Sequence, residues 1–110
     1  MLPKNRRLTR SEYWQVSTQG RSLTQPDLTV KYLPNQTDRS RWAVVTSAKL
    51  SKLATVRNQL RRRIFRQLAT VTDLAGWDVI IFPRSSMLNL VDEKFNAAVD
   101  QMVSTLSGLA

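Results

Sequence analysis

Residues 53–68 read LATVRNQLRRRIFRQL, and this stretch decides the fold. Its apolar residues recur at three- and four-residue steps, which is the spacing of one stripe along an α-helix. The helix is therefore expected to pack by one face and to present basic side chains over much of the remainder. The apolar stripe consists of Leu53, Val56, Leu60, Ile64 and Leu68. The polar residues opposite the stripe or along its edges are Arg57, Asn58, Arg61, Arg62, Arg63 and Arg66.

Strands are predicted on both sides of this helix. Residues 28–33 alternate apolar and polar side chains, as a half-buried strand does. Residues 42–46 are typical of a more buried strand, and the turn residues at 34–38 predict that the two strands pair as a hairpin. Residues 78–82 (DVIIF) begin with an acid and continue as an apolar run, which favours an interior position in a sheet. A further short strand is expected around residues 21–23.

Helices are also predicted near both ends of the chain. Thr9 and Glu12 match a capping box, which opens a short helix that Gly20 ends. The last helix is expected to begin near Asn89 or Asp92, either of which can cap it. Its buried face is predicted to consist of Phe95, Ala98, Val99, Met102 and Leu106.

The order of these elements gives the fold class. Helix, strand, strand, helix, strand and helix follow one another without a repeat or a change in composition. This order predicts an α/β fold (an α+β two-layer sandwich), with helices packed on one small mixed sheet. The 110 residues are expected to form a single domain, with residues 1–8 as an extended N-terminal arm.

The charge of the chain indicates a polyanionic partner. Lys and Arg number 17 against 8 Asp and Glu, for a formal net charge of +9. Residues 1–72 carry a local net charge of +12, residues 73–110 one of −3, and no acid lies between residues 39 and 72. Because a block of one sign repels itself, the arginine-rich helix is expected to bind nucleic acid.

Composition also excludes several classes of function. The chain has no Cys and no His, which excludes thiolate metal sites, disulfides and the common His-based acid/base machinery. The longest apolar run, residues 79–82, is far short of the roughly 20 residues that cross a bilayer. The basic N-terminus is not followed by the apolar stretch of a signal peptide, so residence in the cytoplasm is expected.

Four segments together carry a resemblance to a known family. They are the loop Ser47-Ala48-Lys49, the helix run at 57–63 (RNQLRRR), the opening residues 2–8 (LPKNRRL) and the strand at 77–84 (WDVIIFPR). In order, spacing and length, this chain resembles the bacterial ribonuclease P protein component. Gln59 and Ala48 replace basic residues that are usual there, so contacts with the RNA are expected to be weaker or taken over by Arg62 or Arg63.

The resemblance implies a fold and a role. The fold would contain a left-handed βαβ crossover, which the common preference for right-handed crossovers would not predict. The role would be that of the protein subunit of an endoribonuclease ribonucleoprotein, binding a catalytic RNA and the 5′ leader of precursor tRNA. The chemistry would reside in the RNA with Mg²⁺ held mainly by RNA, and the protein would supply no catalytic residue, metal site or small-molecule cofactor. A ribosomal-type RNA-binding protein or an RNA chaperone remains the alternative.

Two sets of site residues follow from the pattern and the resemblance. The RNA-binding set comprises Lys49, Lys52, Arg57, Asn58, Gln59, Arg61, Arg62, Arg63 and Arg66. A leader-binding cleft between the sheet and the first helix is expected to be lined by Tyr13, Ser17, Lys31 and Tyr32. Ordinary core packing stays an open alternative for both tyrosines, and Trp42 and Trp77 are expected in the core.

Overall fold

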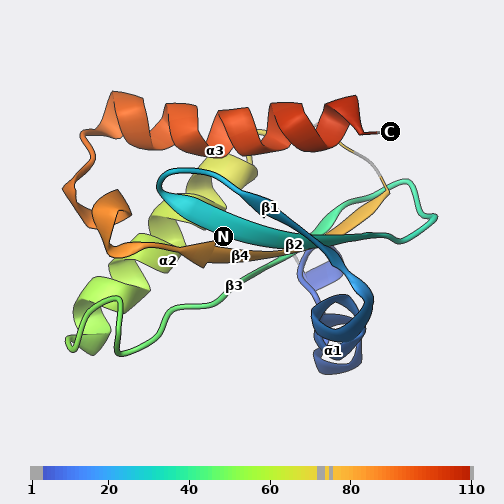
Figure 1. Ribbon diagram of the computed structural model, residues 1–110, viewed down its shortest axis with the longest axis horizontal. Coiled ribbons are helices and arrows are strands. Elements are labelled where there is room, and N and C mark those ends of the chain that lie inside the picture. The colour runs from blue at the N-terminus through green and yellow to red at the C-terminus, as the bar shows by residue number, and fades with distance from the viewer. Residues whose placement is uncertain (1–3, 72–73, 75, 110) are drawn as a thin grey trace.

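The computed structural model describes residues 4–71, 74 and 76–109. In chain order the elements are α1 (Arg10–Gln19), β1 (Arg21–Thr24), β2 (Leu28–Pro34), β3 (Arg41–Val44), α2 (Ala54–Leu68), β4 (Trp77–Pro83) and α3 (Asp92–Gly108). Short 3₁₀ turns, Lys4–Arg6 and Ser85–Asn89, precede α1 and α3 (Figure 1). The predicted α/β class and the predicted strands and helices are confirmed. None of the described helices is long and apolar enough to cross a membrane.

The strands form one mixed sheet in the order β1-β2-β4-β3. β4 pairs antiparallel with β2 and parallel with β3. The predicted hairpin between residues 28–33 and 42–46 is therefore wrong, because β4 lies between them. The physical reason is burial: the run Val79-Ile80-Ile81 is fully buried and takes the interior position that its composition favours. The β3–α2–β4 crossover joins neighbouring parallel strands. That this crossover is left-handed stays a prediction.

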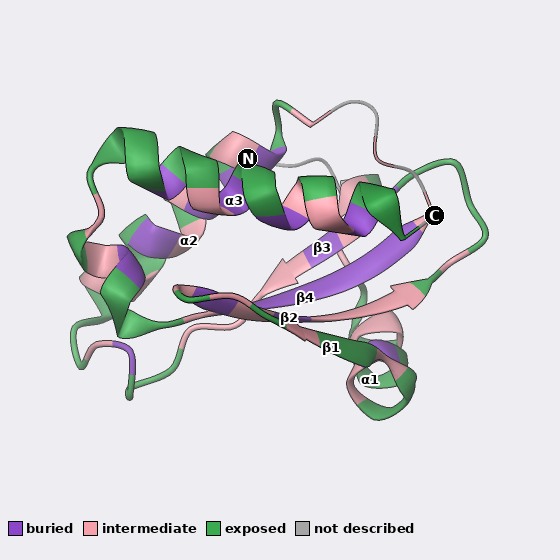
Figure 2. Cartoon of the chain, turned by 45° about the horizontal axis from the view of Figure 1, so that its top comes forward, coloured by how far each residue is buried: buried purple, intermediate pink, exposed green. Residues whose placement is uncertain are grey.

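The two faces of the sheet are covered differently. Successive residues of a strand point to opposite faces, so Val79 and Ile81 lie on one face while Asp78 and Ile80 lie on the other. Helices α2 and α3 cover the first face, and α1 crosses the second (Figures 1 and 2). Figure 2 shows that β4 is buried along most of its length.

The main core lies between the sheet and the helices α2 and α3. Both Trp42 and Trp77 belong to it, as predicted, and so do four of the five residues expected for the buried face of α3. Ala98 is only partly buried against it. The members of this core from the sheet and the two helices include Leu28, Val30, Val79, Ile81, Leu60, Ile64, Phe65, Leu68, Phe95, Val99, Met102 and Leu106.

Helix α1 begins and ends where the sequence predicts. The Thr9 hydroxyl accepts from the Glu12 N–H at 3.3 Å, and the Glu12 carboxylate accepts from the Thr9 N–H at 2.7 Å. The predicted capping box is confirmed. At the other end, a Cβ on Gly20 would lie 2.5 Å from the Val16 carbonyl oxygen, so only glycine fits against the last turn.

Helix α3 begins at Asp92, one of its two predicted starting residues, but details of α2 and α3 differ from expectation. Leu53 is the N-cap of α2 and is 63% exposed, so it is not part of the buried stripe. Phe65, between the apolar and basic faces of α2, is buried. Helix α3 follows Val91, and neither Asn89 nor Asp92 caps it with a side chain. Asn89 instead ends the preceding 3₁₀ turn, and α3 begins three residues later at Asp92.

Residues 4–8 of the expected N-terminal arm contact the rest of the chain. Arg7 forms a parallel bridge with Trp42, and the Leu8 N–H donates to the Trp42 carbonyl at 3.0 Å. The Arg6 guanidinium donates to the carbonyl oxygen of Val71 at 2.9 Å, beyond the last turn of α2, where a positive charge is favoured. Arg7 and Leu8 thus lie beside β3 at the edge of the sheet. Residues 1–3 of the expected arm lie outside the described residues.

Candidate nucleic-acid interface

The outward surface of α2 gathers most of the predicted RNA-binding residues. Asn58, Gln59, Arg62 and Arg66 are exposed on it, while Arg57 and Arg61 are half-buried along its edge. The loop before the helix adds the exposed Lys49 and Lys52. This surface is positive because no acid occurs in residues 39–72.

Three side chains of this surface are held by hydrogen bonds. The Arg57 guanidinium donates to the Ser51 carbonyl at 2.7 Å, which fixes it against the N-terminal turn. The Arg61 guanidinium donates to the Asn58 side-chain oxygen at 2.7 Å. A guanidinium has several N–H donors, so each arginine keeps donors for a phosphate.

A shallow hollow lies in the middle of this surface. It measures ≈ 230 Å³ and is lined by Asn58, Arg61, Arg62 and Phe65. This is below the roughly 300–1,000 Å³ of a small-molecule pocket. Donors on its rim suit an anionic ligand such as a backbone phosphate. The hollow therefore matches the chemistry expected of the helix.

Arg63 differs from the other members of the predicted set. Its guanidinium pairs with the Asp92 carboxylate at 2.9 Å and lies 3.9 Å from the centre of the Phe95 ring. Gln67, one turn later, donates to Asp100 at 2.8 Å. This edge of α2 is thus joined to α3, and Arg63 is a predicted RNA ligand that already has an acidic partner.

Only some of the residues predicted to line the leader cleft lie close together. The Lys31 ammonium donates to the Ser17 carbonyl at 3.1 Å, which joins β2 to the last turn of α1. Tyr13 lies one turn before Ser17 and is half-buried. Tyr32 does not belong with them: it follows Lys31 on the strand, so it points to the opposite face of the sheet. There it packs edge-on against Trp77, with ring centroids 5.5 Å apart.

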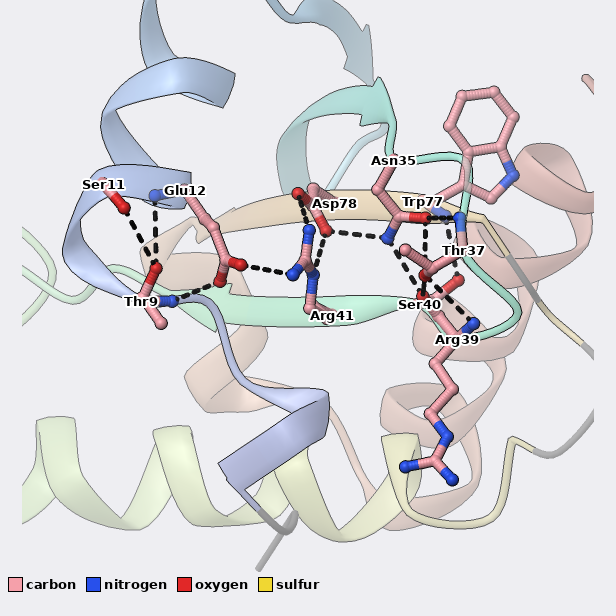
Figure 3. A network of polar contacts seen from close by, with 10 residues as sticks. All are labelled: Thr9, Ser11, Glu12, Asn35, Thr37, Arg39, Ser40, Arg41, Trp77 and Asp78. Atoms are coloured by element: carbon pink, nitrogen blue, oxygen red, sulfur yellow. Dashed lines mark hydrogen bonds and ion pairs between the residues drawn. The ribbon is translucent and has the colours of Figure 1, made fainter.

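A polar network that the sequence pattern did not predict joins α1 to the sheet (Figure 3). Arg41 of β3 donates through Nε and Nη2 to the two carboxylate oxygens of Asp78, at 2.7 and 2.8 Å. The remaining nitrogen, Nη1, pairs with the Glu12 carboxylate. Asn35 donates to Asp78 at 2.8 Å, so the loop before β3 is tied to the same carboxylate.

The electrostatics of the network follow from its burial. Asp78 is 4% exposed, and its carboxylate is satisfied by Arg41 and Asn35. The hydrogen bond to Asp78 raises the pKa of Arg41 above its ordinary value, although burial works in the opposite direction. A signal for this network was present in the sequence, since an acid at the start of an apolar strand needs a partner when it is buried.

The basic surface of α2 offers N–H donors that suit an anion. In the part of the chain that the structure describes, no three acidic side chains gather where they could hold a metal ion. Hard cations such as Mg²⁺ need several oxygen ligands, so the described residues do not fit a Mg²⁺ ion held by the protein itself. What they do provide is a set of positioned N–H donors.

Comparisons with known proteins agree with this picture. A family model described as Ribonuclease P matches residues 2–107. The chain is 33% identical over 110 residues to the ribonuclease P protein component of Synechocystis sp., covering 94% of this chain and 86% of that protein. It is also 33% identical over 85 residues to the protein component of Dehalococcoides mccartyi, covering 77% of this chain and 70% of that protein.

Solved structures give the same result for the fold. The RNase P protein from Thermotoga maritima superimposes with a TM-score of 0.75 at 26% identity, covering 88% of this chain and 94% of that one. An RNase P protein mutant from Staphylococcus aureus superimposes with a TM-score of 0.84 at 18% identity, covering 94% of this chain and 90% of that one. The four-stranded mixed sheet with its three helices is shared with these proteins.

Proposed function

Because the chain belongs to the ribonuclease P protein component family, we propose that it binds the catalytic RNA of ribonuclease P and the 5′ leader of precursor tRNA. It would thereby assist the maturation of tRNA 5′ ends. The observation that carries this proposal is the outward surface of α2, which presents arginines in a stretch of chain without any acid.

The catalytic RNA is assigned to α2 and the loop before it. Guanidinium forks match phosphate oxygens bidentately, and they release counterions when they do so. Asn58 would add a directional hydrogen bond, since Arg61 orients its side chain. Arg63 would contribute less than its neighbours because Asp92 already neutralises it in part. The proposed RNA-binding set is Lys49, Lys52, Arg57, Asn58, Gln59, Arg61, Arg62 and Arg66.

The leader is assigned to the face of the sheet that α1 crosses. Tyr13 offers a half-buried ring on which a base could stack, and stacking tolerates many sequences. Ser17 lies one turn further along α1, and its carbonyl accepts from the Lys31 ammonium. Tyr32 is left out of this proposal because it packs against Trp77 on the other face.

The chemistry of cleavage is assigned to the RNA. The described residues bring together neither a set of metal ligands nor a His- or Cys-based pair. Mg²⁺ would be held mainly by RNA phosphates, and the basic surface of the protein would reduce the repulsion between neighbouring phosphates. In this proposal the protein binds and orients, and it does not transfer protons.

Reconstitution tests the proposal. The purified protein alone should leave precursor tRNA intact. Together with the cognate catalytic RNA, it should promote cleavage at the 5′ end at a Mg²⁺ concentration at which the RNA alone is slow. Robust cleavage by the RNA-free protein would contradict the proposal. An unchanged rate of the RNA on adding the protein would instead favour a ribosomal-type RNA-binding protein or an RNA chaperone.

A further inference from the structure

We propose that Arg41 is a positioning residue for the leader surface, which it supports by tying α1 to the sheet through Glu12 and Asp78. This inference rests on the proposed function, because it concerns the face to which the leader is assigned. Arg41 is not proposed to touch RNA. Its role would be to fix where Tyr13 and Ser17 stand relative to the sheet.

Helix α1 has little apolar attachment of its own. Among residues 10–19, all of which the structure describes, only Val16 is buried. The face of the sheet that α1 crosses includes Ile80. This side chain is fully buried but does not belong to the main core. A helix with so few buried apolar contacts is held less firmly than a core helix, so polar contacts contribute more to its orientation.

Arg41 supplies such a contact at the first turn of α1. Its guanidinium is held on one side by both oxygens of Asp78, on the central strand β4. Its third nitrogen reaches the Glu12 carboxylate. Because a guanidinium is planar and rigid, the position of Glu12 follows from that of Asp78. Glu12 also accepts from the Thr9 N–H, so one carboxylate defines both where α1 starts and where it docks.

Lys31 supplies a second contact at the last turn. Its ammonium donates to the Ser17 carbonyl at 3.1 Å, at the end of the helix where the dipole favours a positive charge. The sheet thus holds α1 at both ends with cationic side chains. Tyr13 and Ser17 lie between or beside these two attachment points, so a loosened first turn would displace the ring of Tyr13 first.

Two matched variants separate docking from helix stability. Glu12→Gln keeps an oxygen that can accept from the Thr9 N–H, since Gln also serves in a capping box, but it removes the charge that pairs with Arg41. Thr9→Ala removes the hydroxyl of the cap and keeps the backbone N–H that Glu12 accepts from, so the pair with Arg41 stays. Replacing Arg41 itself is less informative, because the buried carboxylate of Asp78 would lose its partner and the fold could fail.

The measurement is leader discrimination in the reconstituted ribonucleoprotein. For each variant, the affinity for precursor tRNA with a leader is divided by the affinity for mature tRNA, and the melting temperature of the protein is recorded. Glu12→Gln should lower this ratio by up to about fivefold, the effect expected of one partly exposed ion pair. Thr9→Ala should lower the melting temperature and leave the ratio unchanged.

The outcomes are distinguishable. A wild-type complex that does not prefer the leader-bearing tRNA would overturn the leader assignment of the proposed function. A wild-type preference that Glu12→Gln retains in full would overturn the positioning role of Arg41 alone. An equal loss of discrimination in both variants would also overturn it, since helix stability would then account for the effect.

Discussion

The two faces of the sheet are stabilised by different interactions. On one face, α2 and α3 close over a continuous apolar core that includes Trp42, Phe95 and Ile81. On the other, α1 buries Val16 and is otherwise held by the polar contacts of Arg41 and Lys31. Burying one large apolar side chain contributes about 1.5–3 kcal/mol, whereas an exposed ion pair contributes about 0–1 kcal/mol. The stability of the fold therefore depends mainly on the face that α2 and α3 cover. The face that α1 crosses contributes less to stability, so its residues can bind a ligand.

This difference has a functional consequence. Elements with few apolar contacts open at a lower free energy than core strands and helices do. Helix α1 is such an element, and it lies on the face to which the leader is assigned. Helix α2 combines both roles: Ile64 and Leu68 are fully buried in the core, while Arg62 and Arg66 are exposed on the outward surface.

The largest expected effect separates two neighbouring isoleucines of β4. Ile80 and Ile81 are both fully buried, but Ile80 faces α1 and Ile81 faces the main core. Ile81→Ala should lower the free energy of unfolding by about 2–5 kcal/mol. Ile80→Ala should cost about 2 kcal/mol, at the low end of that range, because α1 can settle into the space. Urea unfolding of both variants measures the difference, and equal costs would remove the proposed contrast between the faces.

A smaller effect is expected at Tyr13. If its ring stacks on a leader base, Tyr13→Ala should weaken binding of precursor tRNA by about 1–3 kcal/mol and leave binding of mature tRNA almost unchanged. Packing in a core predicts a loss of about 3–5 kcal/mol in folding stability instead. Affinity measurements with both tRNAs, beside a thermal melt, decide between them. Equal loss of both ligands with a large drop in melting temperature would exclude the stacking role.

The smallest expected effect compares adjacent arginines of α2. Arg62 is exposed on the outward surface, whereas Arg63 pairs with Asp92 and covers Phe95. Arg62→Ala should reduce the slope of log K against log salt for the catalytic RNA by about 0.7–0.9, as for one lost phosphate contact. Arg63→Ala should change that slope less than Arg62→Ala does, and it should lower stability by about 0.5–1 kcal/mol, the value of one exposed cation–π contact. A larger change of slope at Arg63 would place it back among the RNA ligands.

Features that depend on near neighbours in the chain could be predicted from the sequence. The capping box of Thr9 and Glu12 joins residues three apart, and the apolar stripe of α2 repeats every three or four residues. The interior position of β4 follows from its apolar run, because an edge strand would leave part of such a run exposed to water. The basic outward surface of α2 can also be predicted from the sequence, because helix geometry alone places Arg62 and Arg66 opposite Ile64 and Leu68.

What the tertiary structure alone decided depends on pairs that are distant in the chain. Arg41 and Asp78 are 37 residues apart, and only the insertion of β4 beside β3 brings them together. The same insertion makes the expected hairpin wrong. The sequence predicts Tyr32 and Arg63 as RNA ligands, but β4 beside β2 gives Tyr32 the partner Trp77, and the packing of α3 gives Arg63 the partner Asp92. Local spacing fixes the direction of a side chain within its element, whereas its partner depends on which elements pack together, and that is settled by the burial of the whole core.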